Sequence, residues 1–375
     1  MRVIDLFAGC GGLSLGFIKN GYEITTAVEF DSSIAETYKN NHEGVRVIVD
    51  DIKNIDTTGV FNKNDADVII GGPPCQGFSM AGARIRNGFI DDPRNYLFKH
   101  YFNVVKNVKP KVFIMENVKG LLTMHNGGVF KEIVGLFTNS DLLDGRPYHI
   151  NYKVVKAVDF GIPQKRERVI IIGSLYENID FDKLWLNTKE EIMREIPHYF
   201  EPVTVQDAIG NLGHTTEDGI AVLNEKQSYY EEFLSNGKKT VTNHSQTKHS
   251  KVAIDRMSKI KGGENFQVLD EEIKSVHSGS YGRLLWNEPA QTITTRFDTP
   301  AGGRFIHPVE NRTLSPREAA RIQSFPDDFI FYGSKTSIGK QIGNAVPPKI
   351  SYFLSKLVDK IIEEGNNESN IKRKI

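Results

Sequence analysis

Cysteine is scarce in this chain, at two of 375 residues. So few cysteines exclude a disulfide framework and are typical of proteins from a reducing compartment. The formal net charge is zero, so a polyanionic partner is neither demanded nor excluded, and any basic surface must be local. The sequence also lacks an apolar run long enough to span a bilayer, and its start does not have the pattern of a signal peptide. We therefore expect a cytoplasmic protein.

The rest of the composition is that of a globular protein, with 39% hydrophobic and 25% charged residues. A chain of this length can form one large domain or two ordinary ones. In its first part, segments with the periodicity of strands alternate with segments with the periodicity of helices. Strands are expected at residues 3–7, 22–29, 45–49, 66–70, 111–115 and 169–172, and helices at residues 13–19, 32–40 and 96–108. This alternation predicts an α/β fold with a mostly parallel sheet and helices on both faces.

The character of the sequence changes near residue 175. From there to about residue 304 it is polar, with Gly-Gly, Asn-Gly and Asp-Gly turns and few long apolar patterns. The α/β pattern then returns: Ser315 and Pro316 have the order of a helix cap and first helical residue, and residues 351–364 are amphipathic. The sequence thus predicts a domain at residues 1–174, a smaller irregular domain at 175–304, and a return to the first domain at 305–375.

A glycine-rich turn follows the first expected strand, where residues 8–12 read AGCGG. Glycines let a ligand approach the backbone at the carboxyl end of a strand. The spacing of Gly9, Gly11 and Gly12 does not match G-x-G-x-x-G, the pattern that seats a pyrophosphate. A ligand without phosphates is therefore favoured at this turn.

Acidic residues end the next two expected strands, Glu29 beside Phe30 and Asp51 beside Ile52. Taken singly, each acid is typical of a capping or solvated residue. Together with the glycine turn they place suitable groups at three successive strand ends, because a carboxylate suits ribose hydroxyls and a neighbouring aromatic ring suits adenine. S-adenosyl-L-methionine fits this pattern of an adenosine without phosphates.

Residues 71–79, GGPPCQGFS, hold the most informative cysteine. Pro73 and Pro74 fix the backbone before Cys75 and remove two donors, which gives a rigid approach to the thiol. Rigidity and exposure suit a nucleophile, although a buried structural cysteine is the alternative. Glu116 ends the fifth expected strand, on the same rim of the sheet. A thiolate and a carboxyl group side by side suit addition to an electron-poor heterocycle.

Seven stretches, taken in order, resemble a DNA (cytosine-5)-methyltransferase of the bacterial restriction-modification type. They are residues 5–17, 71–79, 92–98, 116–118, 164–168, 312–329 and 341–348. The resemblance covers nearly the whole chain except the polar middle. It implies a Rossmann-like, S-adenosyl-L-methionine-dependent methyltransferase domain, with residues 175–304 as the target-recognition domain. It also implies a prokaryotic protein of the cytoplasm, associated with the nucleoid.

The resemblance further implies a role for individual residues. Cys75 matches the nucleophile that adds to C6 of cytosine, and Glu116 matches the carboxyl group that contacts N3 and the exocyclic amine. Arg168, together with Arg166, matches the arginines that hold the base O2 and neighbouring charges. The target cytosine must be flipped out of double-stranded DNA. The positions similar to the family's cofactor contacts are Phe7, Gly9, Cys10, Gly12, Glu29, Phe30, Asp51, Ile52, Pro74, Leu97 and Asn344. Residues 341–348 are expected to pack beside the first glycine turn.

The polar middle offers donors for phosphates and base edges, most of them expected to be solvated or to contact phosphate. They lie at residues 243–245, 248–251, 256, 259, 261–263 and 279–283. Residues 77–91 resemble the family's mobile loop, and residues 292–296 resemble a strand at the end of its recognition domain. His244 and His249 have no cysteine or carboxylate at ligand spacing, so no metal is expected.

Three other functions remain as alternatives. A tRNA cytosine-5 methyltransferase would carry a Cys-Phe-Thr signature, and residues 175–304 contain no cysteine. A catalytically inactive DNA-binding regulator does not need Cys75, Glu116 and Arg168, which are all present. A nucleotide-dependent oxidoreductase is disfavoured by the missing pyrophosphate pattern. We expect a monomer. The sequence does not show which bases flank the target cytosine or whether a cognate restriction endonuclease acts on the same site.

Overall fold

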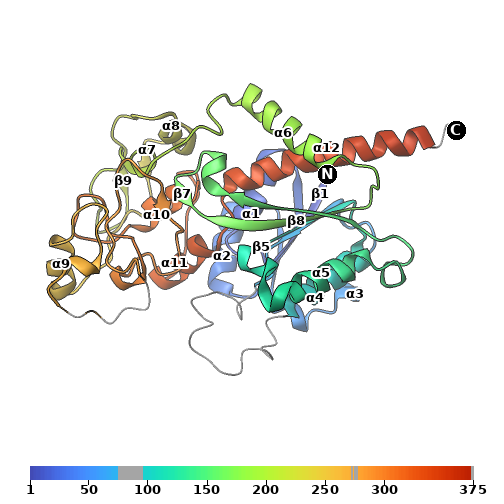
Figure 1. Cartoon of the computed structure of the whole chain (residues 1–375), viewed down its shortest axis with the longest axis horizontal. Helices are drawn as coiled ribbons and strands as arrows, with labels where there is room; N and C mark the ends of the chain where they lie inside the picture. Colours follow the sequence, from blue (N-terminus) through green and yellow to red (C-terminus); the bar gives the residue numbers. More distant parts are fainter. Residues whose placement is uncertain (75–95, 272, 274–277, 373–375) are drawn as a thin grey trace.

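A seven-stranded sheet forms the centre of the computed structural model, which describes residues 1–74, 96–271, 273 and 278–372 (Figure 1). The strand order is β3-β2-β1-β4-β5-β8-β6. Five neighbouring strands are parallel, and β8 runs antiparallel to both β5 and β6. The strands are β1 (Arg2–Leu6), β2 (Glu23–Glu29), β3 (Arg46–Val49), β4 (Val68–Gly71), β5 (Val112–Val118), β6 (His149–Lys156) and β8 (Glu167–Ser174).

The strand order reverses between β1 and β4. The chain passes from β1 outward to β2 and β3, then returns to place β4 on the other side of β1. Crossover connections leave a crevice at such a point, beyond the carboxyl ends of the strands. The fold therefore places the turn after β1 and the segment after β4 side by side, which is where the sequence has its glycine turn and the Pro73-Pro74 pair.

Helices cover both faces of the sheet. On one face α1 (Gly12–Lys19), α6 (Phe181–Glu195) and α12 (Pro348–Lys372) share a core with Val3 and Ile24. On the other face α4 (Leu97–Val108) and α5 (Gly128–Thr138) share a core with Ile4 and Leu6. Alternate residues of β1 thus enter opposite cores, as a strand buried on both faces requires. Two further helices, α2 (Ser32–Asn41) and α3 (Thr57–Val60), complete this part.

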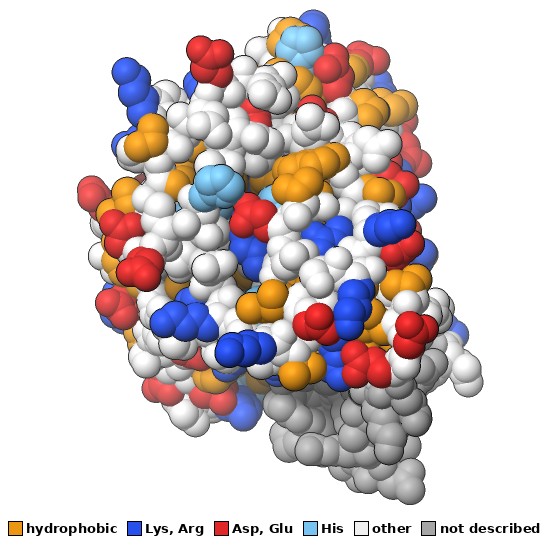
Figure 2. All heavy atoms as spheres, turned by 90° about the vertical axis from the view of Figure 1, so that its left-hand side faces the viewer, with side chains coloured by type: hydrophobic (Ala, Val, Ile, Leu, Met, Phe, Trp, Pro, Cys, Tyr) orange, Lys and Arg blue, Asp and Glu red, His pale blue; other side chains and the backbone are white. Residues whose placement is uncertain are grey.

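A second lobe of short elements lies to the left in Figure 1. Its helices are α7 (Val205–Ile209), α8 (Tyr229–Ser235), α9 (Lys251–Ser258), α10 (Pro316–Ile322) and α11 (Lys335–Asn344), and its strands are β9 (Ala221–Val222), β10 (Thr240–Val241) and β11 (Ala290–Gln291). The strand β11 pairs with β7 (Gln164–Lys165), which connects the lobe to the segment before β8. Figure 2, viewed from this lobe, shows Lys and Arg side chains interspersed with Asp and Glu, so the charge on this face is mixed.

The expected α/β class and the six strands predicted from the sequence are confirmed, with ends that differ by a few residues. The predicted cap at Ser315 is confirmed as well, with Pro316 as the first residue of α10. The helix α2 has a cap of the same kind, in which Asp31 accepts from the Ser33 N–H. The domain boundaries stay a prediction. The helix α6 follows residue 175 in sequence, yet it packs against α12 over the first core. Among the described residues, no helix is both long and apolar enough to cross a membrane.

Candidate functional site

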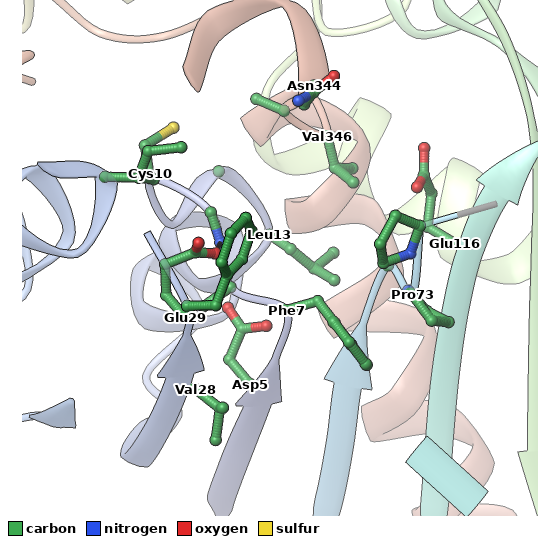
Figure 3. Close-up of a pocket in the computed structure, with 18 of the residues that line it drawn as sticks. Asp5, Phe7, Cys10, Leu13, Val28, Glu29, Pro73, Glu116, Asn344 and Val346 are labelled. Atoms are coloured by element: carbon green, nitrogen blue, oxygen red, sulfur yellow. Dashed lines mark hydrogen bonds between the residues drawn. The ribbon is translucent and has the colours of Figure 1, made fainter. Parts of the chain in front are cut away.

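A cavity of about 750 Å³ opens at the carboxyl edge of the sheet, at the β1–β4 crevice (Figure 3). Its wall is built from the ends of β1, β2, β4 and β5, the segment after β3, and the end of α11. Ten of the eleven predicted cofactor positions line it: Phe7, Gly9, Cys10, Gly12, Glu29, Phe30, Asp51, Pro74, Leu97 and Asn344. Ile52, the eleventh, is buried directly behind Asp51 as the first residue of a short 3-10 helix (Ile52–Asn54).

The glycine turn reverses the chain sharply between β1 and α1. Gly9 and Gly11 have φ of 57° and 93°, and Phe7 itself has a positive φ of 59°. A side chain at Gly12 would place its Cβ 2.5 Å from the Val346 carbonyl oxygen. The Cys10 thiol donates to the Gln341 carbonyl oxygen at 3.6 Å. Residues 341–346 therefore pack against this turn, as predicted, although they are more than 300 residues away in sequence.

Glu29 closes the turn from the end of β2. Its Oε2 accepts from the Gly9 N–H and its Oε1 from the Asp31 N–H, both at 2.9 Å. Burial raises the pKa of Glu29, an effect that these backbone hydrogen bonds oppose. Phe30, the next residue, exposes 69% of its surface. A carboxyl group fixed by backbone donors and a free aromatic face thus lie next to each other.

Asp51 follows β3 and faces the same cavity. Its carboxylate accepts from the Lys53 N–H at 3.1 Å and pairs with the Lys53 ammonium at 3.0 Å. Partial burial raises the pKa of Asp51, but the contacts with Lys53 outweigh it and hold the pKa below its usual value. Asp51 is therefore a charged acceptor at the end of the cavity farthest from β5.

Glu116 lies at the opposite end of the cavity, on β5. It is 8% exposed, and its Oε1 lies 3.0 Å from the Arg168 Nε on the neighbouring strand β8. Its neighbour Asn117 donates from Nδ2 to the Pro73 carbonyl oxygen at 2.9 Å. The Glu116–Arg168 pair is thereby fixed beside the Pro73-Pro74 segment. No sequence signal pointed to Asn117 as a site residue, except its position next to Glu116 in the chain.

Arg166 has a different environment from Arg168. It is 1% exposed, and its guanidinium donates to the carbonyl oxygens of Ile293, Gly343 and Ala345 at 3.4, 3.1 and 3.0 Å. Burial and the nearby Arg168 lower its pKa well below the ordinary value. Arg166 thus connects the segment before β8 to residue 293 and to the end of α11. The buried Gln164 reinforces this connection, because it accepts from the Ile293 N–H at 2.9 Å.

Cys75 and the loop at residues 77–91 lie outside the described residues. Pro74, which precedes Cys75 in the chain, lines the cavity. In the described part of the chain, no three His, Cys, Asp or Glu side chains gather in a way that could hold a metal ion. His244 and His249 are instead hydrogen-bonded to Ser315 and Thr313.

Several predicted DNA donors of the second lobe already have partners within the protein. Arg283 is 4% exposed, and its five N–H groups bond the carbonyl oxygens of residues 257, 260, 307 and 310 and the Asn311 side chain. Arg256 pairs with Glu271, and Lys259 pairs with Asp255, each at 2.7 Å. The expectation that Arg283 offers donors to DNA is wrong for this structure, because its buried guanidinium organises the lobe's interior.

Comparison with known proteins identifies the family to which this chain is similar. The family model described as C-5 cytosine-specific DNA methylase matches residues 1–360. The type II methyltransferase M1.HphI of Haemophilus parahaemolyticus is 34% identical, covering 96% of this chain and 87% of that protein. M.DdeI of Desulfomicrobium norvegicum is also 34% identical, covering 99% and 92%.

Solved structures agree with these sequence matches. A prophage-encoded DNA modification methyltransferase from E. coli superposes with a TM-score of 0.73 at 29% identity, covering 97% of this chain and 99% of that one. The Dnmt2 methyltransferase of S. pombe superposes with a TM-score of 0.60 at 14% identity, covering 96% of this chain and 99% of that one, which shows a shared fold.

Proposed function

The chain belongs to the C-5 cytosine-specific DNA methylase family, and from this premise we propose that it methylates cytosine in a short double-stranded sequence through Cys75. Its similarity to this family and to type II methyltransferases identifies it as a DNA cytosine-5-methyltransferase of the restriction-modification type. The observation that supports the mechanism best is the continuity of the cavity. It runs from Asp51 and Glu29, past the glycine turn, to Glu116 and Arg168, with Pro74 in its wall.

The residues of the cavity fit S-adenosyl-L-methionine. Asp51 offers an acceptor for the adenine amino group, Glu29 an acceptor for ribose hydroxyls, and Phe30 a ring for stacking. Gly9 lines the cavity without a side chain, and a Cβ there would meet no atom within 4 Å. Asn344 lies across from the turn, at the top of the cavity in Figure 3. This cofactor supplies an electrophilic methyl group.

The protein's own groups act on the cytosine ring. The Cys75 thiolate adds to C6, and the displaced electron pair moves through C5 toward N3, where Glu116 as a carboxylic acid donates a hydrogen bond. Arg168 pairs with Glu116 and would contact the base O2. C5 would then take the methyl group with release of S-adenosylhomocysteine, a base would remove the C5 proton, and elimination would restore the double bond and free the thiolate. Arg166, with three bonds to backbone carbonyls, fits a positioning role beside Arg168.

The partners follow from this chemistry. A cytosine C5 within a duplex is out of reach of Cys75, so the base must be flipped into the cavity at a cost of a few kcal/mol. Residues 175–304 are then the target-recognition domain, and a cognate restriction endonuclease would act on the same site. A monomer, and a cytoplasmic location at the nucleoid, stay predictions from the sequence.

Methyl transfer from labelled S-adenosyl-L-methionine tests the proposal, with duplex DNA and tRNA as competing acceptors. DNA from a host without cytosine methylation should become labelled, and bisulfite sequencing should place the methyl groups at C5 of one sequence. Cys75→Ser should abolish transfer and still bind the cofactor. Labelling of tRNA alone, or full activity of Cys75→Ser, would overturn the proposal.

A further inference from the structure

Lys349 is a buried lysine for which the proposed reaction gives no role. It is the second residue of α12 and is 2% exposed. Its side-chain amine donates to the carbonyl oxygens of Gly161 at 2.9 Å and of Tyr199 at 2.7 Å. The same amine lies over the rings of Tyr199, Tyr230 and Phe233, at 4.5, 5.3 and 5.4 Å from their centroids. Backbone oxygens and aromatic faces thus take the place of water around it.

The side chain of Lys349 lies where the two lobes meet. Gly161 belongs to the part that holds the sheet, whereas Tyr230 and Phe233 belong to α8 of the second lobe. Phe233 packs against both the core beneath α12 and the core of the second lobe. The backbone N–H of Lys349 donates to the Ser324 hydroxyl, just after α10, at 3.2 Å. In Figure 1 the first turn of α12 points toward the second lobe, so one residue contacts both parts.

The surroundings of the amine disfavour its positive charge. Burial, followed by the positive charge of Lys19, lowers the pKa of Lys349 to about 7. The positive end of the α12 dipole acts in the same direction, because Lys349 lies in the first turn of that helix. The carbonyl oxygens and the rings favour the ammonium form, but they carry no full negative charge that would balance it. The junction therefore holds a lysine that is partly neutral at neutral pH.

The other titratable and charged groups of the described residues do not balance this charge either. Those that face the amine or the rings around it are Lys19 from α1, Tyr199 from the segment after α6, Tyr230 from α8, Arg321 from α10 and Tyr352 from α12. Burial raises the pKa of Tyr199 and Tyr230 well above the usual value, so both phenols are neutral. Burial lowers the pKa of Lys19, and the Asp328 carboxylate opposes this effect. Asp328 thus acts on Lys19, and the groups that act on Lys349 include no carboxylate.

We propose that Lys349 is a proton-sensitive joint between the two lobes. The neutral amine is stable in the closed junction, and protonation favours a state in which α8 has moved away and water solvates the ammonium group. The inference stands apart from the proposed function, which adds only that a duplex has to contact both lobes.

The direction of the pH dependence follows from the two states of the joint. A solvated lysine has a pKa of about 10.4, above the value of about 7 in the closed junction. Between these values the open state binds more protons than the closed state, so the closed state becomes more stable as the pH rises. Below about pH 7 both states are protonated, and the dependence ends.

Hydrogen exchange with mass spectrometry measures the opening of the joint. The full-length protein is labelled between pH 6 and 9, with labelling times scaled for the intrinsic exchange rate. The opening constant of amides in α8 and at residues 196–201 should fall about tenfold per pH unit between pH 8 and 9 and level off below pH 7. Amides of β5, which lies in the centre of the sheet, should not show this dependence.

Lys349→Met is the diagnostic variant, because it keeps an unbranched side chain of similar length and cannot take up a proton. It should remove the pH dependence of α8 opening. Lys356→Met is the matched control on the same helix. Lys356 pairs with Glu195 at 2.9 Å and with Glu191 at 3.4 Å, so its loss should leave the pH dependence of α8 as in the wild type.

A direct titration of the lysine side chains completes the test. With lysine labelled at the ε-carbon with ¹³C, one resonance of the wild type should titrate near pH 7 and be missing from Lys349→Met. Titration of every lysine above pH 9, equal pH dependence in Lys349→Met, or a parallel change in β5 would overturn the inference. The wild-type exchange series and titration decide it even if Lys349→Met does not fold. None of these measurements uses cofactor or DNA, so a negative result leaves the proposed function intact.

Discussion

At the scale of single residues, the site separates into groups that face the cavity and groups that hold them. Glu116 faces the cavity and is paired with Arg168 at 3.0 Å, whereas the neighbouring Asn117 bonds the Pro73 carbonyl oxygen. Arg166 and Arg168 are two residues apart, yet Arg166 donates to three backbone carbonyl oxygens, whereas Arg168 pairs with a carboxylate. The sequence predicted that both arginines belong to the site, but it contained no signal that distinguishes their environments.

Glu116→Gln tests the residue facing the base. The amide keeps nearly the same shape but cannot act as an acid toward N3, so methyl transfer should fall by about 10²–10⁴-fold. Cofactor binding should stay near that of the wild type, because Glu116 lies at the far end of the cavity from Asp51 and Glu29. Turnover and calorimetric cofactor affinity are the two measurements.

Glu167→Gln is the matched control for Glu116→Gln. Glu167 is also the carboxylate of a strand residue, but it is solvent-exposed in part and pairs with Lys119 at 2.9 Å. Its loss should change turnover less than twofold, because Glu167 is not among the described residues that line the cavity. Equal losses in the two variants would contradict the role given to Glu116.

At the scale of elements, short-range sequence patterns predicted the strands and the helix cap, because neighbouring residues largely determine both. The strands β4 and β5 contain apolar runs at residues 68–70 and 112–115, and the caps at Asp31 and Ser315 follow from side-chain acceptors before a helix. The edge strand β6 was not predicted, because only one residue of HINYKVVK is buried and the strand mixes polar with apolar residues. The helix α6 was not predicted either, because it lies in the stretch from residue 175 onward that was interpreted as polar and rich in turns.

Gly12→Ala tests the packing of the glycine turn against the C-terminal segment. The new Cβ would lie 2.5 Å from the Val346 carbonyl oxygen, which is backbone and moves only with residues 345–346. We expect a loss of about 1–3 kcal/mol in the free energy of unfolding and weaker cofactor binding. Chemical denaturation and calorimetry measure the two effects.

Gly135→Ala provides the comparison for Gly12→Ala. Gly135 lies within α5, and a Cβ there meets nothing within 4 Å. Replacing a helical glycine with alanine should stabilise the protein by about 0.5–1 kcal/mol. If Gly12→Ala were as stable as Gly135→Ala, the close packing of residues 341–346 on the turn would be refuted.

At the scale of the whole molecule, the site depends on contacts between distant parts of the chain. Arg166 joins the segment before β8 to residues 293, 343 and 345. The resemblance to a family predicted that residues 341–348 return to the first glycine turn, and the structure confirms it. Composition and periodicity do not predict such contacts, because they carry no information on long-range pairing. The burial of Arg283 was missed for the same reason.

Arg166→Lys tests this long-range connection. A lysine keeps the charge but cannot reach three carbonyl oxygens in one plane. Both thermal stability and turnover should fall, and the loss of turnover should include a rise in KM for DNA, because the lobes lose their fixed arrangement. In Arg168→Lys, by contrast, turnover should fall while stability changes little. Unchanged stability in Arg166→Lys would contradict the positioning role.

The central claim is that the Cys75 sulfur bonds to C6 of a flipped cytosine. A duplex carrying 5-fluorocytosine at the methylated position tests it directly, because C5 of that base has no proton to lose after methyl transfer and elimination cannot follow. With S-adenosyl-L-methionine, the wild-type protein should form a DNA adduct that survives denaturing electrophoresis, with the modified peptide containing Cys75. Absence of an adduct in a preparation that methylates the normal duplex, or an adduct of the same yield in Cys75→Ser, would contradict the account.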